Sequence, residues 1–318
     1  MEKERIAYGS PASVYGQPEG EPERRRVLAE REKQRRRQLQ LRRRKRRRVM
    51  SAAVASAVVV GILLWNLPQW LDGASSSRIS GGADLSTGAD TPQLEALKAL
   101  EPEYPELSSV IGNIQDYAQG AVELFLNNQE SIEYLLDYPQ ESGKKHRMKI
   151  AEDLREADKI PLFIQWDERW GYEPYGSGLI GWTGCGPTCL SMAVVGLTGK
   201  ERWNPAEVAE FSEERGYYTV NAGTSWDFMT QGAEELGLSS SELPLQESRI
   251  RSVLDEGGVV ICSVGPGDFT TEGHYILIRD YDENGFLVND PNSRQRSAME
   301  WSYERLAPQI KNLWALYA

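Results

Sequence analysis

An uncharged, mostly apolar run from Val49 to Leu71 limits the folds open to this chain more than any other feature. A helix needs about 20 mostly apolar residues to cross a bilayer core, and Trp65 and Trp70 suit the far interface. We therefore predict a single transmembrane helix over residues 49–71. A cleaved secretory signal is the alternative, because small residues at 73–75 follow the run. The basic segment before the run is, however, far longer than the basic N-terminal region of a usual signal peptide.

The charge on the two sides of this run is strongly asymmetric. Residues 1–48 hold 17 of the 36 Lys and Arg and 7 of the 47 Asp and Glu, which leaves 19 basic and 40 acidic residues in the rest of the chain. Basic residues beside a span mark its cytoplasmic side. We expect residues 1–48 to be a basic cytoplasmic tail and the C-terminal part to be extracytoplasmic, so the protein is predicted to be a single-pass protein of the cell membrane.

The basic tract also has the charge pattern of a phosphate-binding segment. Beside a membrane span, however, such a tract is explained by topology and by attraction to anionic lipid, at about 1 kcal/mol per basic residue. We therefore predict the lipid bilayer as the partner of the N-terminal region and no nucleic acid.

The sequence after the span falls into three parts. Residues 72–91 are mainly Gly, Ala, Ser, Thr and Asp, which is typical of a flexible linker. Over 92–159, apolar residues recur at spacings of three and four, which predicts a helical spacer; a pro-segment that covers an active site is the alternative. Residues 160–318 form the third part, in which helices are predicted at 185–196, 205–215, 226–236 and 247–256 and strands at 259–264, 274–280, 286–289 and 313–317. Helices followed by antiparallel strands predict an α+β domain.

Cys185 stands in the sequence TGCGPT (183–188), at the predicted N-terminus of an apolar helix. A thiol attacks only as the thiolate, and a helix N-terminus with a nearby imidazolium lowers its pKa. The flanking glycines leave room for a substrate carbonyl, and the first helical amides can stabilise an oxyanion. A buried structural cysteine is the alternative.

The chain has only two histidines, His146 and His274. His146 lies in the charged sequence KKHR, which is typical of a solvated linker, whereas His274 begins a predicted strand after a turn containing glycines. The hairpin that follows can return Asp290 to the side of His274, where a carboxylate would orient the ring. Asn289 and Asn292 are alternatives for that role, and a core histidine is the alternative for His274 itself.

These residues, taken together, resemble those of the peptidase family thirty-nine-like domains, which are relatives of the bacteriocin double-glycine leader peptidases within the papain-like fold. The resemblance covers 160–318 and rests on QWD (165–167), WG (170–171), GCGPT (184–188), GHY (273–275) and DPNS (290–293). It implies a papain-like cysteine peptidase fold, with Cys185 as nucleophile, His274 as general base and acid, and Asp290 as orienting acid. It also implies Gln165 as the oxyanion-hole donor, although Gln165 lies farther upstream of the cysteine than is usual and is otherwise a surface glutamine.

The predicted function is that of a membrane-anchored extracytoplasmic thiol protease, which hydrolyses peptide or amide bonds through an acyl-enzyme. Its substrate would be a peptide or protein, with cell-wall peptide as one case; the double-glycine substrate of the leader peptidases does not carry over. A transpeptidase or acyltransferase using the same residues and a non-catalytic binding or scaffolding module of the cell envelope remain alternatives. No cofactor or metal is predicted, and Cys189 and Cys262 are either buried thiols or a disulfide.

Overall fold

The computed structural model describes residues 91–318, apart from 157–158 and 221–222. These residues belong to one compact unit, Ala83–Ala318. The predicted tail (1–48), the predicted transmembrane helix (49–71) and the predicted linker up to residue 90 lie outside the described residues. Within the described ranges, no helix has the length and apolar character that crossing a membrane requires.

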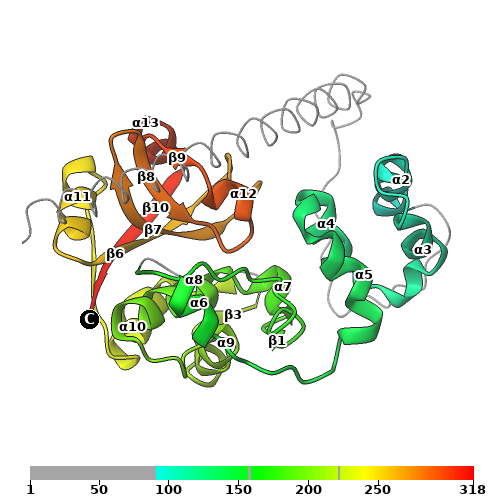
Figure 1. The fold of residues 1–318 in the computed structure, drawn as a ribbon, viewed down its shortest axis with the longest axis horizontal. Coiled ribbons are helices and arrows are strands. Elements are labelled where there is room, and N and C mark those ends of the chain that lie inside the picture. Colours follow the sequence, from blue (N-terminus) through cyan, green and yellow to red (C-terminus); the bar gives the residue numbers. More distant parts are fainter. Residues whose placement is uncertain (1–90, 157–158, 221–222) are drawn as a thin grey trace, which may run out of the picture. The chain divides into compact units, whose positions relative to one another are not determined.

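The first described segment is helical (Figure 1). Thr91 caps its first helix by accepting a hydrogen bond from the Leu94 amide, and Pro92 occupies the first turn, where its missing N–H costs nothing. The segment consists of α2 (Pro92–Leu100), α3 (Leu107–Gly112), α4 (Gln119–Asn127) and α5 (Ile132–Glu141), with 3₁₀ turns at η1 (Ile114–Asp116) and η2 (Gln129–Ser131). We call residues 92–141 the helical segment below.

A six-stranded antiparallel sheet follows later in the chain, in the order β5-β10-β6-β7-β8-β9. Its strands are β5 (Ser239–Glu242), β6 (Val259–Val264), β7 (His274–Asp282), β8 (Gly285–Asn289), β9 (Glu300–Trp301) and β10 (Ile310–Tyr317). Four strands were predicted close to these bounds, whereas β5 and β9 were not. The α+β class with an antiparallel sheet is therefore confirmed.

Helices and small hairpins surround this sheet. The helices are α6 (Ala151–Glu156), α7 (Ile180–Thr183), α8 (Cys185–Thr198), α9 (Pro205–Glu214), α10 (Gln231–Glu235), α11 (Glu247–Asp255), α12 (Arg294–Ser297) and α13 (Tyr303–Leu306), with 3₁₀ turns η3 (Trp226–Met229) and η4 (Ala307–Gln309). The two hairpins pair β1 (Pro174–Tyr175) with β2 (Gly178–Leu179) and β3 (Tyr218–Thr219) with β4 (Gly223–Thr224). The single helix predicted over 226–236 is wrong, because the chain breaks at Thr230 into η3 and α10.

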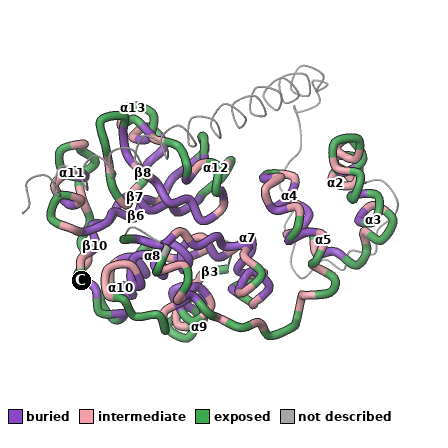
Figure 2. Tube along the Cα trace, viewed as in Figure 1, coloured by how far each residue is buried: buried purple, intermediate pink, exposed green. Residues whose placement is uncertain are grey.

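The sheet is covered on both faces, which is why β6 is apolar along almost its whole length. Val259 and Ile261 face a core shared with α8, while Val260 and Cys262 face a second core shared with α11. This alternation follows from the period of two in a strand. Figure 2 shows the resulting burial of α8 and β6. Each large aliphatic side chain buried in this way contributes about 1.5–3 kcal/mol, so α8 is firmly held against the sheet.

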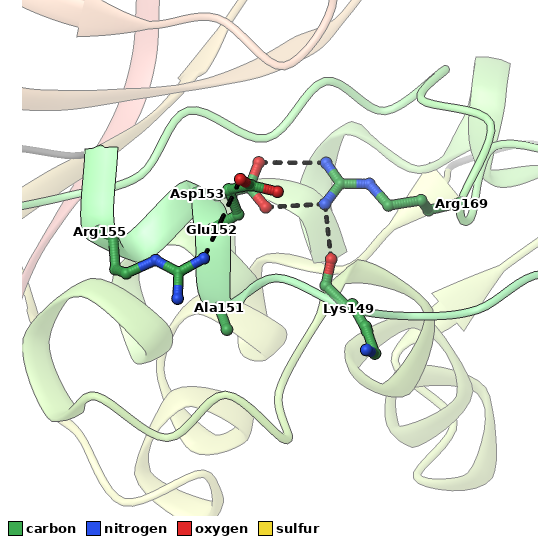
Figure 3. Close-up of a pocket in the computed structure, with 6 residues that line it drawn as sticks. All are labelled: Lys149, Ala151, Glu152, Asp153, Arg155 and Arg169. Atoms are coloured by element: carbon green, nitrogen blue, oxygen red, sulfur yellow. Dashed lines mark hydrogen bonds and ion pairs between the residues drawn. The ribbon is translucent and has the colours of Figure 1, made fainter.

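Arg169 connects α6 to the loop after residue 165. Its guanidinium group contacts the Asp153 carboxylate at 2.7 Å and the Asp167 carboxylate at 2.8 Å, and it also donates to the Lys149 carbonyl. Figure 3 shows the contacts with Asp153 and Lys149 beside a hollow whose other lining residues include Glu152 and Arg155. The ion pairs of Arg169 thus hold α6 in place.

Candidate active site

Cys185 is the first residue of α8 and is partly exposed. Pro187 lies in the first turn of this helix, where an amide hydrogen has no helical partner, and the helix ends at Gly199 in the left-handed conformation (φ 69°). Gly186 allows the close approach of Thr224, because a Cβ at this position would lie 2.7 Å from the Thr224 hydroxyl. The sequence therefore places a partly exposed cysteine in a tight turn at the start of a buried helix.

His274 is the first residue of β7 and pairs with Val264 of β6. Its ring is buried, with 8% exposure, and its Nε2 lies 2.8 Å from Oδ1 of Asp290. The Cys185 thiol also acts on this ring and helps to raise its pKa, so the two side chains are neighbours. Because Nε2 is taken by Asp290, Nδ1 is the ring nitrogen left for Cys185. The imidazole therefore interacts with the Asp290 carboxylate and with the Cys185 thiol.

Asp290 reaches His274 through the β7–β8 hairpin, as the sequence predicted. In the register of that hairpin, Leu277 is opposite Asn289, so residue 290 falls opposite Ile276 and on the same face of the sheet as His274. The Asp290 carboxylate is fully buried, and its Oδ1 also accepts a hydrogen bond from the Asn292 amide at 2.8 Å.

The two alternative orienting residues are engaged elsewhere. The Asn289 side chain accepts from Arg279 and donates to the Pro161 carbonyl at 2.9 Å. The Asn292 side chain accepts a hydrogen bond from the Trp166 indole at 3.1 Å. Of the three residues considered, the structure brings only Asp290 to the imidazole.

The electrostatics of the pair favour a charged thiolate and a charged imidazolium. Burial acts to raise the pKa of the Cys185 thiol, but the neighbouring His274 imidazole outweighs burial and lowers the pKa. Burial acts to lower the pKa of His274, but the negative charge of Asp290 outweighs it and raises the pKa to about 9. Between these two pKa values, the proton resides on His274 rather than on sulfur.

Arg296 is a contact of Asp290 that the sequence analysis missed. Its Nε donates to Oδ2 of Asp290, on the side of the carboxylate away from the histidine. Burial opposes ionisation of Asp290, but His274 and Arg296 together keep its pKa below the ordinary value. The sequence shows only that an arginine lies six residues after Asp290. The turn between the two residues has no spacing rule from which their contact could have been predicted.

Gln165 is buried rather than a surface residue, with 3% exposure. Its backbone amide donates to the Pro291 carbonyl at 2.7 Å, and its side-chain amide donates to the Gly181 carbonyl at 2.9 Å. Its side-chain oxygen has no partner. Gln165 therefore lies between the chain that follows Asp290 and helix α7, which precedes Cys185.

The remaining cysteines and the other histidine lie outside this arrangement. Cys189 and Cys262 are buried free thiols, and burial raises the pKa of each. His146 is not in a solvated linker as predicted, because its side chain is only 18% exposed, bonds to Glu141 and lies against the Tyr172 ring.

Two of the solved structures that match this chain are described as peptidases. A peptidase domain from Streptococcus ComA, described as a bifunctional ABC transporter involved in quorum sensing, is 20% identical and superposes with a TM-score of 0.33 over 42% of this chain and 91% of its own. A C39-like peptidase from Bacillus anthracis, described only as a candidate, is 14% identical, with a TM-score of 0.31 over 50% of this chain and 94% of its own.

A search of curated proteins gave no match. The Peptidase_C39 like family matches residues 157–318, which is half of the chain and includes all four predicted site residues. The sequence resemblance is therefore confirmed, and the chain belongs to the Peptidase_C39 like family.

Proposed function

We propose that this protein is a cysteine peptidase that hydrolyses peptide or amide bonds, with Cys185 as nucleophile, His274 as general acid and base, and Asp290 as the residue that orients the ring. The observation that carries the proposal is the position of the His274 imidazole, which bonds to the Asp290 carboxylate and neighbours the Cys185 thiol. The lowered pKa of the thiol and the raised pKa of the imidazole, about 9, support the same reading. Membership of a peptidase family supports peptide as the substrate class.

The reaction begins from the thiolate and the imidazolium. The Cys185 sulfur attacks the scissile carbonyl carbon and forms a C–S bond, which moves an electron pair onto the carbonyl oxygen. When the tetrahedral intermediate collapses, the C–N bond breaks and the His274 imidazolium gives its proton to the leaving amine. Water then attacks the acyl-enzyme while His274 accepts one of its protons, and cleavage of the C–S bond releases the acid and restores the starting pair.

The oxyanion would be stabilised beside the start of α8. The amides in the first turn of a helix have no partner within that helix, and the Cys185 amide is one of them. Gln165 is proposed as the second donor, since its side-chain nitrogen carries one hydrogen beyond the one given to Gly181. This assignment is supported by its buried position between Pro291 and Gly181.

The peptidase domain is proposed to act outside the cell, on a single N-terminal membrane anchor. The basic residues of 1–48 and the apolar run at 49–71 support this topology. Peptides exposed at the outer face of the membrane, including cell-wall peptide, are then the available substrates. Labelling of Cys185 in intact cells by a membrane-impermeant thiol reagent tests the location, and labelling only after lysis would refute it.

Hydrolysis is tested by incubating the full-length protein with a mixture of peptides in ¹⁸O-water and analysing the products by mass spectrometry. We expect new C-termini that carry ¹⁸O and that are absent with the Cys185→Ala variant. Products in which the acyl group is joined to an added amine would instead support a transpeptidase or acyltransferase. An unchanged mixture, together with a thiol of ordinary reactivity, would support a binding module.

A further inference from the structure

The loop that follows Asp290 is held by residues from the helical segment, more than 160 positions earlier in the chain. The Glu130 carboxylate accepts hydrogen bonds from the Ser293 hydroxyl and from the amides of Arg294 and Gln295, the latter two at 3.0 and 3.2 Å. The Asn128 side chain donates to the Asn292 carbonyl. We call residues 291–295, which include the start of α12, the acid loop.

This contact is well placed to fix the candidate acid. The Asn292 amide donates to Oδ1 of Asp290, the oxygen that also binds His274, so the acid loop sets the position of that oxygen. Asn128 is 7% exposed and is fixed in turn by accepting from the Glu130 amide. A carboxylate accepts stronger hydrogen bonds than a neutral oxygen does, so Glu130, with three donors, holds the acid loop in one position.

The helical segment also contacts the two other parts of the chain that carry site residues. Ile164 and Trp166, on either side of Gln165, belong to a hydrophobic cluster whose other members include Val110, Phe125 and Leu135 of the helical segment. The Trp166 indole donates to the same Asn292 carbonyl that Asn128 binds, at 3.1 Å.

Helix α7, which directly precedes Cys185, packs on the helical segment as well. A Cβ on Gly120 of α4 would lie 2.4 Å from the Trp182 ring, and one on Gly181 would lie 2.5 Å from the Tyr134 hydroxyl. The same hydroxyl donates to the Gly171 carbonyl at 2.8 Å. Residues beside Gln165 and residues of α7 therefore pack against helices that precede the family match, which begins at residue 157.

We propose that Asn128 and Glu130 are positioning residues of the active site, which hold the acid loop so that Asp290 keeps His274 aligned with Cys185. This inference rests on the proposed function. It makes the helical segment a part of the catalytic unit, in place of a spacer or a pro-segment that covers the active site.

The test measures the rate of iodoacetamide alkylation of Cys185 against pH, which needs no substrate, in the full-length protein. The Glu130→Gln variant removes the carboxylate charge, and Glu133→Gln is the matched control, because Glu133 is exposed on the next helix. The Asn128→Asp variant is a second perturbation, since it keeps the acceptor for the Glu130 amide but loses the donor to Asn292. Thermal unfolding of each variant is followed alongside.

We expect Glu130→Gln and Asn128→Asp to label about three- to tenfold more slowly at pH 6 than the wild type, because a displaced Asp290 stabilises the imidazolium less and the thiolate fraction falls by tenfold per pKa unit. Glu133→Gln should match the wild type. Rate–pH profiles of the two variants that superimpose on that of the wild type would overturn the inference, even if their unfolding temperatures fall.

The same experiment separates this inference from the proposed function. A wild-type profile of an ordinary thiol, unaffected by His274→Ala, would remove the proposed function itself. A shifted wild-type profile that His274→Ala abolishes, but that both variants retain, would leave the proposed function intact and reject only the role of Asn128 and Glu130.

Discussion

Replacing Asp290 by Asn removes the charge that keeps His274 protonated. Asp290 is fully buried and lies 2.8 Å from Nε2 of His274, and its charge is the largest influence that raises the histidine pKa to about 9. Without that charge, burial of the ring dominates, and we expect the pKa to fall below its ordinary value of about 6.5. A fall of about 2.5 in pKa corresponds to about 3 kcal/mol of lost imidazolium stabilisation.

This change can be measured by NMR on the full-length protein with isotope-labelled histidine. The chain has only two histidines, so the His274→Ala variant assigns both signals. We expect the His274 signal to titrate near pH 9 in the wild type and below pH 6.5 in Asp290→Asn. A His274 signal that titrates near pH 6.5 in the wild type, or that stays near pH 9 in the variant, would refute the reasoning.

Two further substitutions probe the chain around the thiol. Gly186→Ala puts a Cβ 2.7 Å from the Thr224 hydroxyl, so we expect the free energy of unfolding to fall by about 1–3 kcal/mol in chemical denaturation. Gly112→Ala is the control and should not destabilise the protein, because nothing lies within 4 Å of its Cβ. Equal stabilities of the two variants would contradict the packing argument. Gln165→Ala should lower kcat by about 10²–10³-fold in a peptide-cleavage assay. It should not slow Cys185 alkylation, because the amide is proposed to act on the oxyanion alone. An unchanged kcat would remove Gln165 from that role.

Local signals in the sequence were enough to predict the central part of the fold and site. Helix α8 was predicted because glycine and proline before a continuous apolar run mark a helix start, and β7 and β8 because apolar strands flank a short turn. The hairpin between these strands brings Asp290 close to His274, so the pairing of these two residues could also be predicted.

Contacts between residues far apart in the sequence could not be predicted from local patterns. Strand β5 has the sequence SSSE, which carries no apolar pattern, and it is a strand because it pairs with β10 at the sheet edge. The contacts of Glu130 with the acid loop join residues more than 160 apart, and those of Arg296 depend on a loop conformation. The burial of Gln165 likewise depends on how the helical segment packs, and no local pattern specifies that packing.

The central claim is that Cys185 and His274 form a thiolate–imidazolium pair, and the pH dependence of Cys185 alkylation by iodoacetamide tests it most directly. The two other cysteines are buried, with raised pKa values, and Cys185→Ala controls for any labelling of them. We predict fast labelling that persists below pH 7 and is lost in His274→Ala. Labelling that rises only near pH 8.5, as for an ordinary thiol, or that ignores His274→Ala, would contradict the account.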